Sequence, residues 1–204
     1  MAKQPLPTPE QLRQLLRYEP ETGKLFWLER TPDMFVDGDH SARHSCAAWN
    51  AKRAGTEAFT ATNAWGHRRG NLFKQALKAH RVAWAIHYGE WPTGEIDHAN
   101  GDPADNRIVN LRIASSQQNK WNRGSRPGSQ SRFVGVQSNG CGKWYAQIVL
   151  DGQFKYLGTY DTEEEAALAR DRVALKHHGE FARLNFPGQL DQVPGEQARL
   201  GCET

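Results

Sequence analysis

The sequence predicts an α+β protein built from two small domains. Its 204 residues fit one or two domains, and 38% hydrophobic with 24% charged residues is ordinary for a globular chain. A short run that can be a strand ends in Asp97-His98, a loop rich in Asn, Asp, Gly and Pro follows, and a short apolar run over 111–114 then leads into a helix start. Further on, Asn139-Gly140 and Asp151-Gly152 are hairpin signals between strand-like runs. These patterns predict a strand, loop, strand and helix unit, followed by a three-stranded antiparallel sheet with one helix.

The first 93 residues are expected to form helices and short strands around an apolar core. Thr8 is a candidate N-cap, and Pro9 suits the first position of a helix that reaches about Arg17. A longer helix follows, which Gly89 ends. The expected elements are a helix over 9–17, strands over 24–28, 55–62 and 68–73, and a helix over about 79–88.

The stretch 31–53 shows no convincing period and is predicted to be a surface loop. His40 and His44 lie in it. No Cys or carboxylate repeats at ligand spacing around them, so a metal role for this pair is disfavoured.

The C-terminal part is predicted to be a sheet covered by a helix. Strands are expected over 133–137, 143–150 and 154–160, and a helix over 163–178 that begins with a Thr162/Glu165 capping box. Strand alternation places Trp144, Ala146 and Ile148 in the core and Tyr145, Gln147 and Val149 on the opposite face. Residues 188–204 are polar and expected to be disordered.

Composition excludes several classes of protein. No apolar run could span a bilayer and the N-terminus lacks the apolar core of a signal peptide, so an intracellular, cytoplasmic protein without a membrane partner is expected. Cys46, Cys141 and Cys202 are too far apart for a zinc knuckle, and no disulfide framework is indicated. The net charge is only +3, so any affinity for DNA must come from local patches.

Chemistry concentrates between Glu95 and Asn122. Asn100-Gly101-Asp102-Pro103 is turn chemistry that folds the second strand back beside the first. Ser115 with Gln118 has the pattern of a capping box and starts the following helix. This arrangement would bring four polar side chains toward one small volume and create a metal site: Asp97, His98, Asn110 and Asn119.

Asp97-His98, the run DNRIVNLR ending in Asn110-Leu111-Arg112, and Asn119 closely resemble the HNH nuclease motif, in the phage and intron-encoded variant. The resemblance extends upstream through His80-Arg81 and covers roughly residues 10–123. It implies a ββα-metal (HNH) nuclease domain over 1–123, with its core at about 94–123, that binds one divalent cation, Mg or Mn, and hydrolyses a DNA phosphodiester.

The resemblance also assigns roles to residues. Asp97 and Asn119 match the metal ligands, His98 the general base, and Asn110 the middle Asn that braces the loop and the histidine. It places His80-Arg81 behind the site, with a phosphate contact by Arg81 as the lesser alternative. The residue types suit the reaction independently, because a hard cation held by oxygen ligands neutralises the leaving oxygen and a neutral imidazole accepts the proton of water.

The C-terminal sheet and helix resemble the DNA-binding domain of plant APETALA and ethylene-response-factor proteins. Gly135-Val136, Trp144-x-Ala146-x-Ile148, the run YLGTY over 156–160 and the run GEFARLNF over 179–186 carry the likeness. In that family the sheet lies in the major groove of double-stranded DNA. The plant domains concentrate Arg and Trp on this face, whereas this chain has fewer, which suggests weaker base readout.

Candidate DNA contacts fall in two places. Residues 124–132 form a basic Gly/Ser/Pro linker, for which a solvated hinge and a phosphate-contacting segment are both consistent. The sheet of the 133–187 domain supplies the others. The candidates are Lys120, Arg123, Arg126, Arg132, Gln137, Lys143, Tyr145, Gln147, Lys155 and Tyr156.

The combined interpretation is a metal-dependent DNA endonuclease positioned by a C-terminal DNA-binding domain, of phage or mobile-element homing or nicking type. No small-molecule cofactor is expected. A monomer would nick one strand, and a homodimer could cut both. Two alternatives are a non-catalytic DNA-binding regulator that retains the HNH scaffold, and a structure-directed nuclease for branched or RNA-containing substrates.

Overall fold

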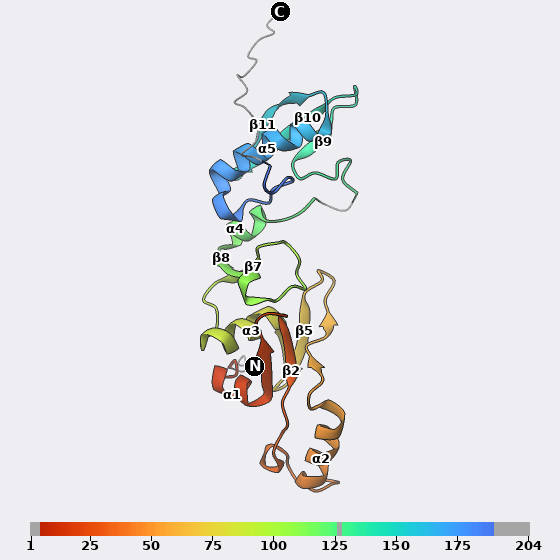
Figure 1. The fold of residues 1–204 in the computed structure, drawn as a ribbon, viewed down its shortest axis with the longest axis vertical. Helices are drawn as coiled ribbons and strands as arrows, with labels where there is room; N and C mark the ends of the chain where they lie inside the picture. Colours follow the sequence, from red (N-terminus) through yellow and green to blue (C-terminus); the bar gives the residue numbers. More distant parts are fainter. Residues whose placement is uncertain (1–4, 126–127, 190–204) are drawn as a thin grey trace, which may run out of the picture. The chain divides into compact units, whose positions relative to one another are not determined.

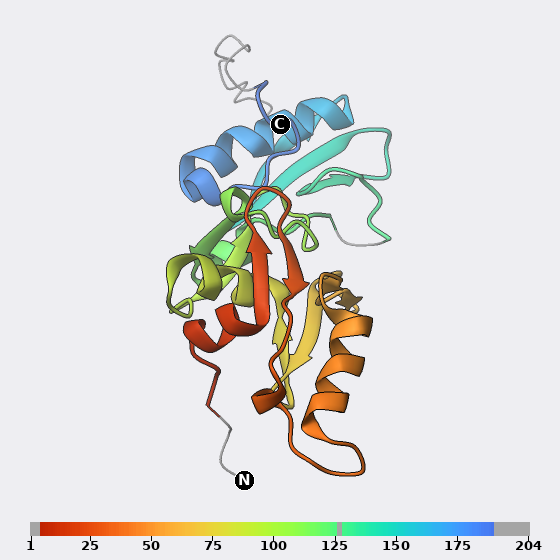
Figure 2. The same ribbon diagram turned by 60° about the horizontal axis from the view of Figure 1, so that its bottom comes forward.

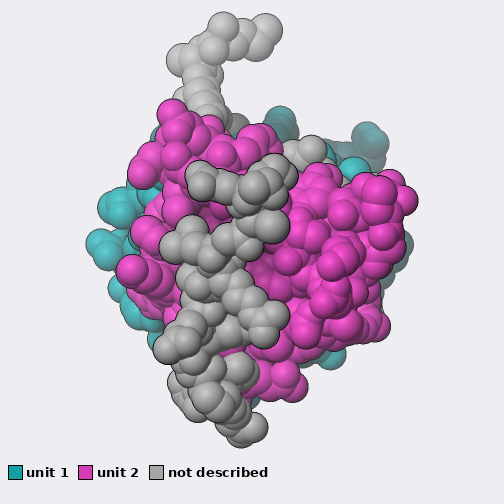
Figure 3. Space-filling view, turned by 90° about the horizontal axis from the view of Figure 1, so that it is seen from above, with its two compact units in different colours: residues 1–119 teal, residues 120–204 magenta. Residues whose placement is uncertain are grey.

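A computed structural model describes residues 5–125 and 128–189. The chain divides into two compact units, residues 1–119 (unit 1) and 120–204 (unit 2), which are coloured separately in Figure 3. Arg126, Cys202 and nearly all of the predicted tail lie outside the described residues. No helix in the described ranges is long and apolar enough to cross a membrane.

Unit 1 combines helices with three small antiparallel sheets, which confirms the mixed α and β composition of the prediction. The sheets have the strand orders β1-β2-β3, β4-β5-β6 and β7-β8. Strands β2, β5, β7 and β8 are labelled in Figure 1. The elements are α1 (Pro9–Leu15), β1 (Leu16–Glu19), β2 (Lys24–Trp27), η1 (Pro32–Met34), α2 (Ala42–Arg53), β3 (Glu57–Ala58), β4 (Ala61–Thr62), β5 (Arg68–Leu72), β6 (Gln75–Lys78), α3 (Ala79–Tyr88), β7 (Glu95–His98), η2 (Ile108–Asn110), β8 (Leu111–Ala114) and α4 (Ser116–Trp121), the last of which runs into unit 2.

The main core of unit 1 lies between α1, α3 and the first two sheets. Leu12 of α1 and Val82 of α3 are fully buried in it, together with Leu16 and Leu25 of the first sheet. Thr8 caps α1 with the expected capping box, and Gly89 ends α3 at a φ of 79°. Both helices are confirmed, although α1 stops at Leu15 because Leu16 is already extended and begins β1.

The predicted surface loop over 31–53 is wrong, because residues 42–53 form α2, drawn in orange in Figure 2. Cys46 is the one buried residue of this fully described helix, so no apolar stripe marks it in the sequence. Polar contacts hold it instead. The Ser41 hydroxyl accepts from the His44 amide at 3.2 Å, and the Asn50 side chain exchanges two hydrogen bonds of 2.9 Å with the Arg30 backbone.

Strand β6 was not predicted, because its hairpin lacks a glycine. The turn between β5 and β6 is made by Phe73 at φ 50° and Lys74 at φ 61°. Positive φ at both central positions is the geometry for which Asn-Gly is the usual signal. Because Phe and Lys are not typical of such turns, the sequence gives no signal for this hairpin.

Unit 2 is a three-stranded antiparallel sheet with α5 lying along it (Figure 1), as predicted in type and order. Ala166, Ala167 and Ala174 are fully buried, so the small side chains allow the helix to lie close to the sheet. Ala146 and Ile148 are also buried, and a bulge interrupts the pairing after Ala146. The elements are β9 (Val136–Ser138), β10 (Trp144–Leu150), β11 (Gln153–Tyr160), α5 (Glu163–His178) and η3 (Gly179–Phe181).

A buried carboxylate fastens the segment after η3 to α5. Asp171 is 0% exposed and accepts hydrogen bonds from the backbone amides of Asn185, at 2.5 Å, and Phe186, at 2.9 Å. The Asn185 side chain then pairs with the backbone of Val134 at the start of the sheet. One aspartate therefore joins helix, sheet and C-terminal segment.

We expect Asp171→Ala to destabilise unit 2 by about 3–5 kcal/mol, because the substitution leaves the amides of Asn185 and Phe186 without their hydrogen-bond acceptor. Amide hydrogen exchange in β10 and α5 measures this. Asp161→Ala, which removes an exposed carboxylate paired with Lys143 at 2.9 Å, is the control and should cost at most about 1 kcal/mol. Equal effects of the two substitutions would contradict the anchoring role.

Candidate active site

The β7–β8 hairpin carries the residues that the sequence singled out. Asp97 pairs with Arg112 and His98 with Leu111 across the two strands. Ile96 and Leu111 pack with Ala83 of α3 in a small core. Because successive strand residues face opposite sides, Asp97 lies on one face of the hairpin, and His98 lies on the face that packs toward α3.

Asn110 holds the two halves of the loop between the strands together. Its side-chain nitrogen donates to the Asp105 carbonyl at 2.8 Å, and its side-chain oxygen accepts from the Asn100 amide at 2.9 Å. Its own carbonyl accepts from the Ala99 amide at 2.9 Å. All three contacts fix the loop that begins directly after His98.

Two turns from other parts of unit 1, each containing a glycine, pack closely against the same loop. A Cβ on Gly23 would lie 2.4 Å from the Arg107 amide nitrogen, and one on Gly66 would lie 2.9 Å from Pro103. Both glycines also have positive φ, so a side chain is disfavoured at each position on two grounds. The Tyr18 hydroxyl adds a 2.7 Å hydrogen bond to the Asn106 carbonyl.

Oxygen donors gather on the Asp97 face of the hairpin. Glu95 lies two residues before Asp97, so both carboxylates face the same way. Glu95 accepts from the Ser116 hydroxyl at 2.5 Å and from the Asn119 side-chain nitrogen at 2.6 Å, and thereby holds α4. The bond from the nitrogen leaves the Asn119 amide oxygen as the atom that could bind a cation. Arg112 donates to one oxygen of Asp97 at 2.8 and 2.7 Å and orients this carboxylate.

This donor set fits a hard divalent cation. Carboxylate and amide oxygens are the ligands that Mg²⁺ and Mn²⁺ prefer, and such ions retain open positions for water and phosphate. Asp97 and Asn119 lie on elements that Glu95 ties together. Arg112 would share the Asp97 carboxylate with the ion.

His98 lies in a cluster of three imidazoles. The ring centroids of His67, His80 and His98 are 5.1 to 5.5 Å apart. His98 is 4% exposed and its Nε2 contacts the Asn106 side-chain oxygen at 3.1 Å. Burial lowers the pKa of all three groups, that of His80 to about 2. All three rings are therefore neutral at pH 7.

Sequence reasoning missed four of these partners: Glu95, Arg112, His67 and Asn106. The first two could have been found from the geometry of a strand pair. Side chains two residues apart share a face, which places Glu95 beside Asp97, and Arg112 is the cross-strand partner of Asp97. His67 and Asn106 carry no such signal. Arg81 points away from a phosphate role, because its guanidinium donates to the carbonyls of Gly94 and Pro92.

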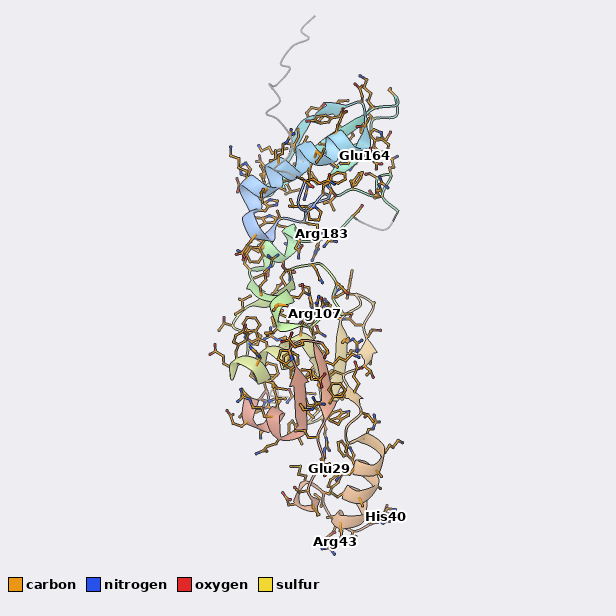
Figure 4. The ribbon with its side chains drawn as sticks, in the orientation of Figure 1. Glu29, His40, Arg43, Arg107, Glu164 and Arg183 are labelled. Atoms are coloured by element: carbon orange, nitrogen blue, oxygen red, sulfur yellow. The ribbon has the colours of Figure 1, made fainter. Side chains whose placement is uncertain are left out.

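The exposed pair His40 and His44 lies at the start of α2. Their rings are 5.0 Å apart. His40 and Arg43 lie at the opposite end of unit 1 from Arg107, which belongs to the loop braced by Asn110 (Figure 4). The pair is thus remote from the hairpin.

In unit 2, several candidate DNA contacts already have partners. Arg132 pairs with Glu164 at 2.9 Å and Lys143 with Asp161 at 2.9 Å. Tyr145 donates to Gln137 at 2.6 Å, and Tyr156 shares a 2.6 Å hydrogen bond with Thr159. Lys155 bonds Gln153 at 3.2 Å, Gln147 is half-buried, and Lys120 and Arg123 are exposed.

The sequence model of the HNH endonuclease family matches residues 77–120, which include both strands of the hairpin and most of α4. An HNH endonuclease domain is therefore present. Protein 3.8 of Escherichia phage T7 is 31% identical over 115 residues, which cover 55% of this chain and 93% of the phage protein. The chain belongs to the family of phage T7 protein 3.8.

This member of the protein 3.8 family is also similar to plant proteins over shorter stretches. APETALA2-like protein 2 of Oryza sativa is 40% identical over 78 residues, 37% of this chain and 17% of the plant protein. Dehydration-responsive element-binding protein 2D of Arabidopsis thaliana is 39% identical over 74 residues, 35% of this chain and 36% of that protein. The likeness thus concerns a minor part of each plant protein.

We expect Asn110→Ala to loosen the loop after His98, because it removes a side chain that bonds both halves of the loop, at a cost of about 1–3 kcal/mol. Hydrogen exchange at the Asn100 amide should accelerate. Val109→Ala, at a neighbouring position that is 85% exposed, is the matched control and should leave this exchange unchanged. Unchanged protection in Asn110→Ala would mean that the glycine turns alone hold the loop.

Proposed function

We propose that this protein is a metal-dependent DNA endonuclease of the HNH type, whose ββα-metal core is formed by β7, β8 and α4. The main support is that, within the segment that matches the HNH family, Asp97 and His98 end β7 and Asn119 of α4 donates to Glu95 of the same strand. Carboxylate and amide oxygens with an adjacent neutral imidazole are what hydrolysis of a phosphodiester requires.

Asp97 and Asn119 are the proposed ligands of one Mg²⁺ or Mn²⁺ ion. When bound, such an ion supplies positive charge against the charge that develops on the leaving 3′ oxygen. Glu95 positions Asn119 through the amide nitrogen, and Arg112 orients Asp97. Asn110 is a positioning residue in this proposal, because its side chain bonds both halves of the loop that follows His98.

His98 is the proposed general base. The Asn106 oxygen accepts from its Nε2, which assigns the hydrogen to Nε2 and the lone pair to Nδ1. Burial lowers the pKa of His98 and so keeps the ring able to take the proton of the attacking water at neutral pH.

The scissile phosphate must lie at the end of β7. Asp97 and His98 face opposite sides of the strand, so a single group can reach both only where the strand gives way to the loop. The loop that starts at Ala99 leaves the strand at this point. This placement also explains why the loop needs a fixed shape.

Unit 2 is the proposed positioning module, with the domain at 133–187 joined to the nuclease domain by the 124–132 linker. The sheet face opposite α5 presents Tyr145, Gln147 and Tyr156, and Phe154 beside them is also exposed. Lys155 pairs with Ile148 and so lies on the α5 side, but it is exposed on the edge strand β11, where it could reach a phosphate beside the sheet. Lysine and aromatic side chains without a row of arginines favour backbone contact over base readout. The similarity to dehydration-responsive element-binding protein 2D of Arabidopsis thaliana supports this assignment.

A phage or mobile-element enzyme of homing or nicking type is the proposed biological setting, supported by the similarity to a phage protein. One HNH site cuts one strand. A monomer would therefore nick, and a homodimer would be required for a concerted double-strand break.

Purified protein should convert supercoiled plasmid DNA to nicked product with Mg²⁺ or Mn²⁺ and lose this activity in EDTA. His98→Ala should lower the single-turnover rate by about 10²- to 10⁴-fold, because the general base is removed. Asp97→Ala should raise the Mg²⁺ concentration needed for half-maximal cleavage. Gel separation of supercoiled, nicked and linear DNA measures all three.

His177→Ala is the control, since it removes an exposed histidine of α5 and should cleave normally. Full single-turnover cleavage by His98→Ala would refute the general base. Stable DNA binding without cleavage in either metal would instead favour the regulator that retains an HNH scaffold, and selective cleavage of branched DNA would favour the structure-directed nuclease.

We expect Lys155→Ala to weaken binding of duplex DNA regardless of sequence and to reduce the salt slope of binding by about 0.9, the loss of one phosphate contact. Fluorescence anisotropy at several salt concentrations measures the slope. Lys176→Ala, which removes an exposed lysine from the last turn of α5, should leave it unchanged. Equal salt slopes for Lys155→Ala and Lys176→Ala would show that Lys155 does not contact a phosphate of the DNA.

A further inference from the structure

Three histidines from separate elements of unit 1 meet side by side. His67 precedes β5, His80 lies in the first turn of α3, and His98 ends β7. One ring nitrogen from each lies within 4.8 Å of the other two, and in the described ranges no other group of three or more His, Cys, Asp or Glu side chains is gathered in this way. His67 lies outside the segment that matches the HNH family.

Two of these rings have a buried nitrogen that the protein does not satisfy. Nδ1 of His67 and Nδ1 of His80 have no hydrogen-bond partner, and His80 is 3% exposed. Buried polar atoms are normally paired, so an unpaired one needs an explanation. Two unpaired imidazole nitrogens in one cluster point to a ligand shared between them.

The cluster has the electrostatic character of a metal site rather than an anion site. Burial disfavours the charged form of an imidazole, and His80 and His98 are only 3% and 4% exposed. Neutral imidazoles carry a lone pair and do not repel one another. The Asn106 oxygen accepts from Nε2 of His98, the kind of outer contact that fixes the ring orientation of histidine ligands in metal sites.

We propose that His67, His80 and His98 form a binding site for a borderline divalent cation of the Zn²⁺ class, separate from the oxygen donors Asp97 and Asn119. Imidazole suits Zn²⁺ and its neighbours in the transition series, whereas Mg²⁺ prefers oxygen. One face of the hairpin would thus bind a transition-metal ion through imidazole, and the other face would bind Mg²⁺ or Mn²⁺ through oxygen.

The geometry allows this with small movements. Nitrogens around a tetrahedral Zn²⁺ lie roughly 3.3 Å apart, since Zn–N distances are about 2.0–2.1 Å. Ring rotations that bring each nitrogen inward by roughly 1 Å would close the trio from its 4.8 Å spacing. His67, on a surface turn and half-buried, is the ring with most room to move. Three protein ligands leave a fourth position for water.

Occupation of this site would silence the nuclease. A neutral imidazole has one lone pair, and the ion would take the lone pair with which His98 accepts the proton of water. Metal binding by the trio and base catalysis by His98 therefore exclude each other. This consequence rests on the proposed function, whereas the binding itself does not.

The test is a Co²⁺ titration of the full-length protein, followed by visible absorption and by calorimetric competition with Zn²⁺. We expect one equivalent with the intense bands of tetrahedral Co²⁺. His67→Gln and His80→Gln should abolish the bands or weaken Zn²⁺ binding at least tenfold, with circular dichroism confirming the fold. His44→Gln is the matched control, because it breaks the exposed His40 and His44 pair and should leave the signal intact.

Weak octahedral bands alone, or tetrahedral bands that survive in both trio variants, would overturn the site, as would their loss in His44→Gln. In a cleavage assay with Mg²⁺, added Zn²⁺ should inhibit the wild type, and His67→Gln should need at least tenfold more Zn²⁺ relative to its own uninhibited rate. Binding without inhibition would remove His98 from the ligand set. If no cleavage occurs in Mg²⁺ at all, the proposed function fails, but the spectroscopic result still decides the site.

Discussion

The fixed path of the chain from Ala99 to Asn110 is the constraint on which the rest of unit 1 depends. Asn110 closes this loop from within, and the turns at Gly23 and Gly66 approach it so closely that a Cβ on either would collide with it. The β1–β2 hairpin, the β4–β5 hairpin and the HNH segment are therefore fitted around a single loop. Residues distant in sequence reach the hairpin because these turns pack there: the Gly66 turn brings His67 next to His98.

The hairpin separates two kinds of chemistry by the alternation of a strand. Glu95 and Asp97 carry anionic oxygens on the face where α4 begins, while His98 faces neutral imidazoles on the side of α3. Carboxylates near a histidine raise its pKa. On the α3 side burial is the largest effect on His98 and lowers its pKa, although Asp97 acts in the opposite direction.

Elements with a local signal were predictable, and elements held by distant contacts were not. Helix α5 has a capping box, three acidic residues in its first turn and a terminal glycine, and its predicted bounds are those observed. Helix α2 depends on the bonds between Asn50 and Arg30, twenty residues away. The motif marked Asp97, His98, Asn110 and Asn119 as candidates, but the placement of His67 beside His98 follows from packing between hairpins that no local pattern encodes.

Burial of His98 has two opposite consequences for its proposed role as general base. Removal from water lowers its pKa and keeps the lone pair available, yet a ring that is 4% exposed cannot meet a reacting water in the middle of a strand. The position at the end of β7 reconciles the two requirements, because the backbone departs there into a loop whose shape Asn110 sets. The same burial brings His98 against His67 and His80. An environment that keeps His98 neutral, as its proposed role as general base requires, would thus also suit it to bind a transition metal.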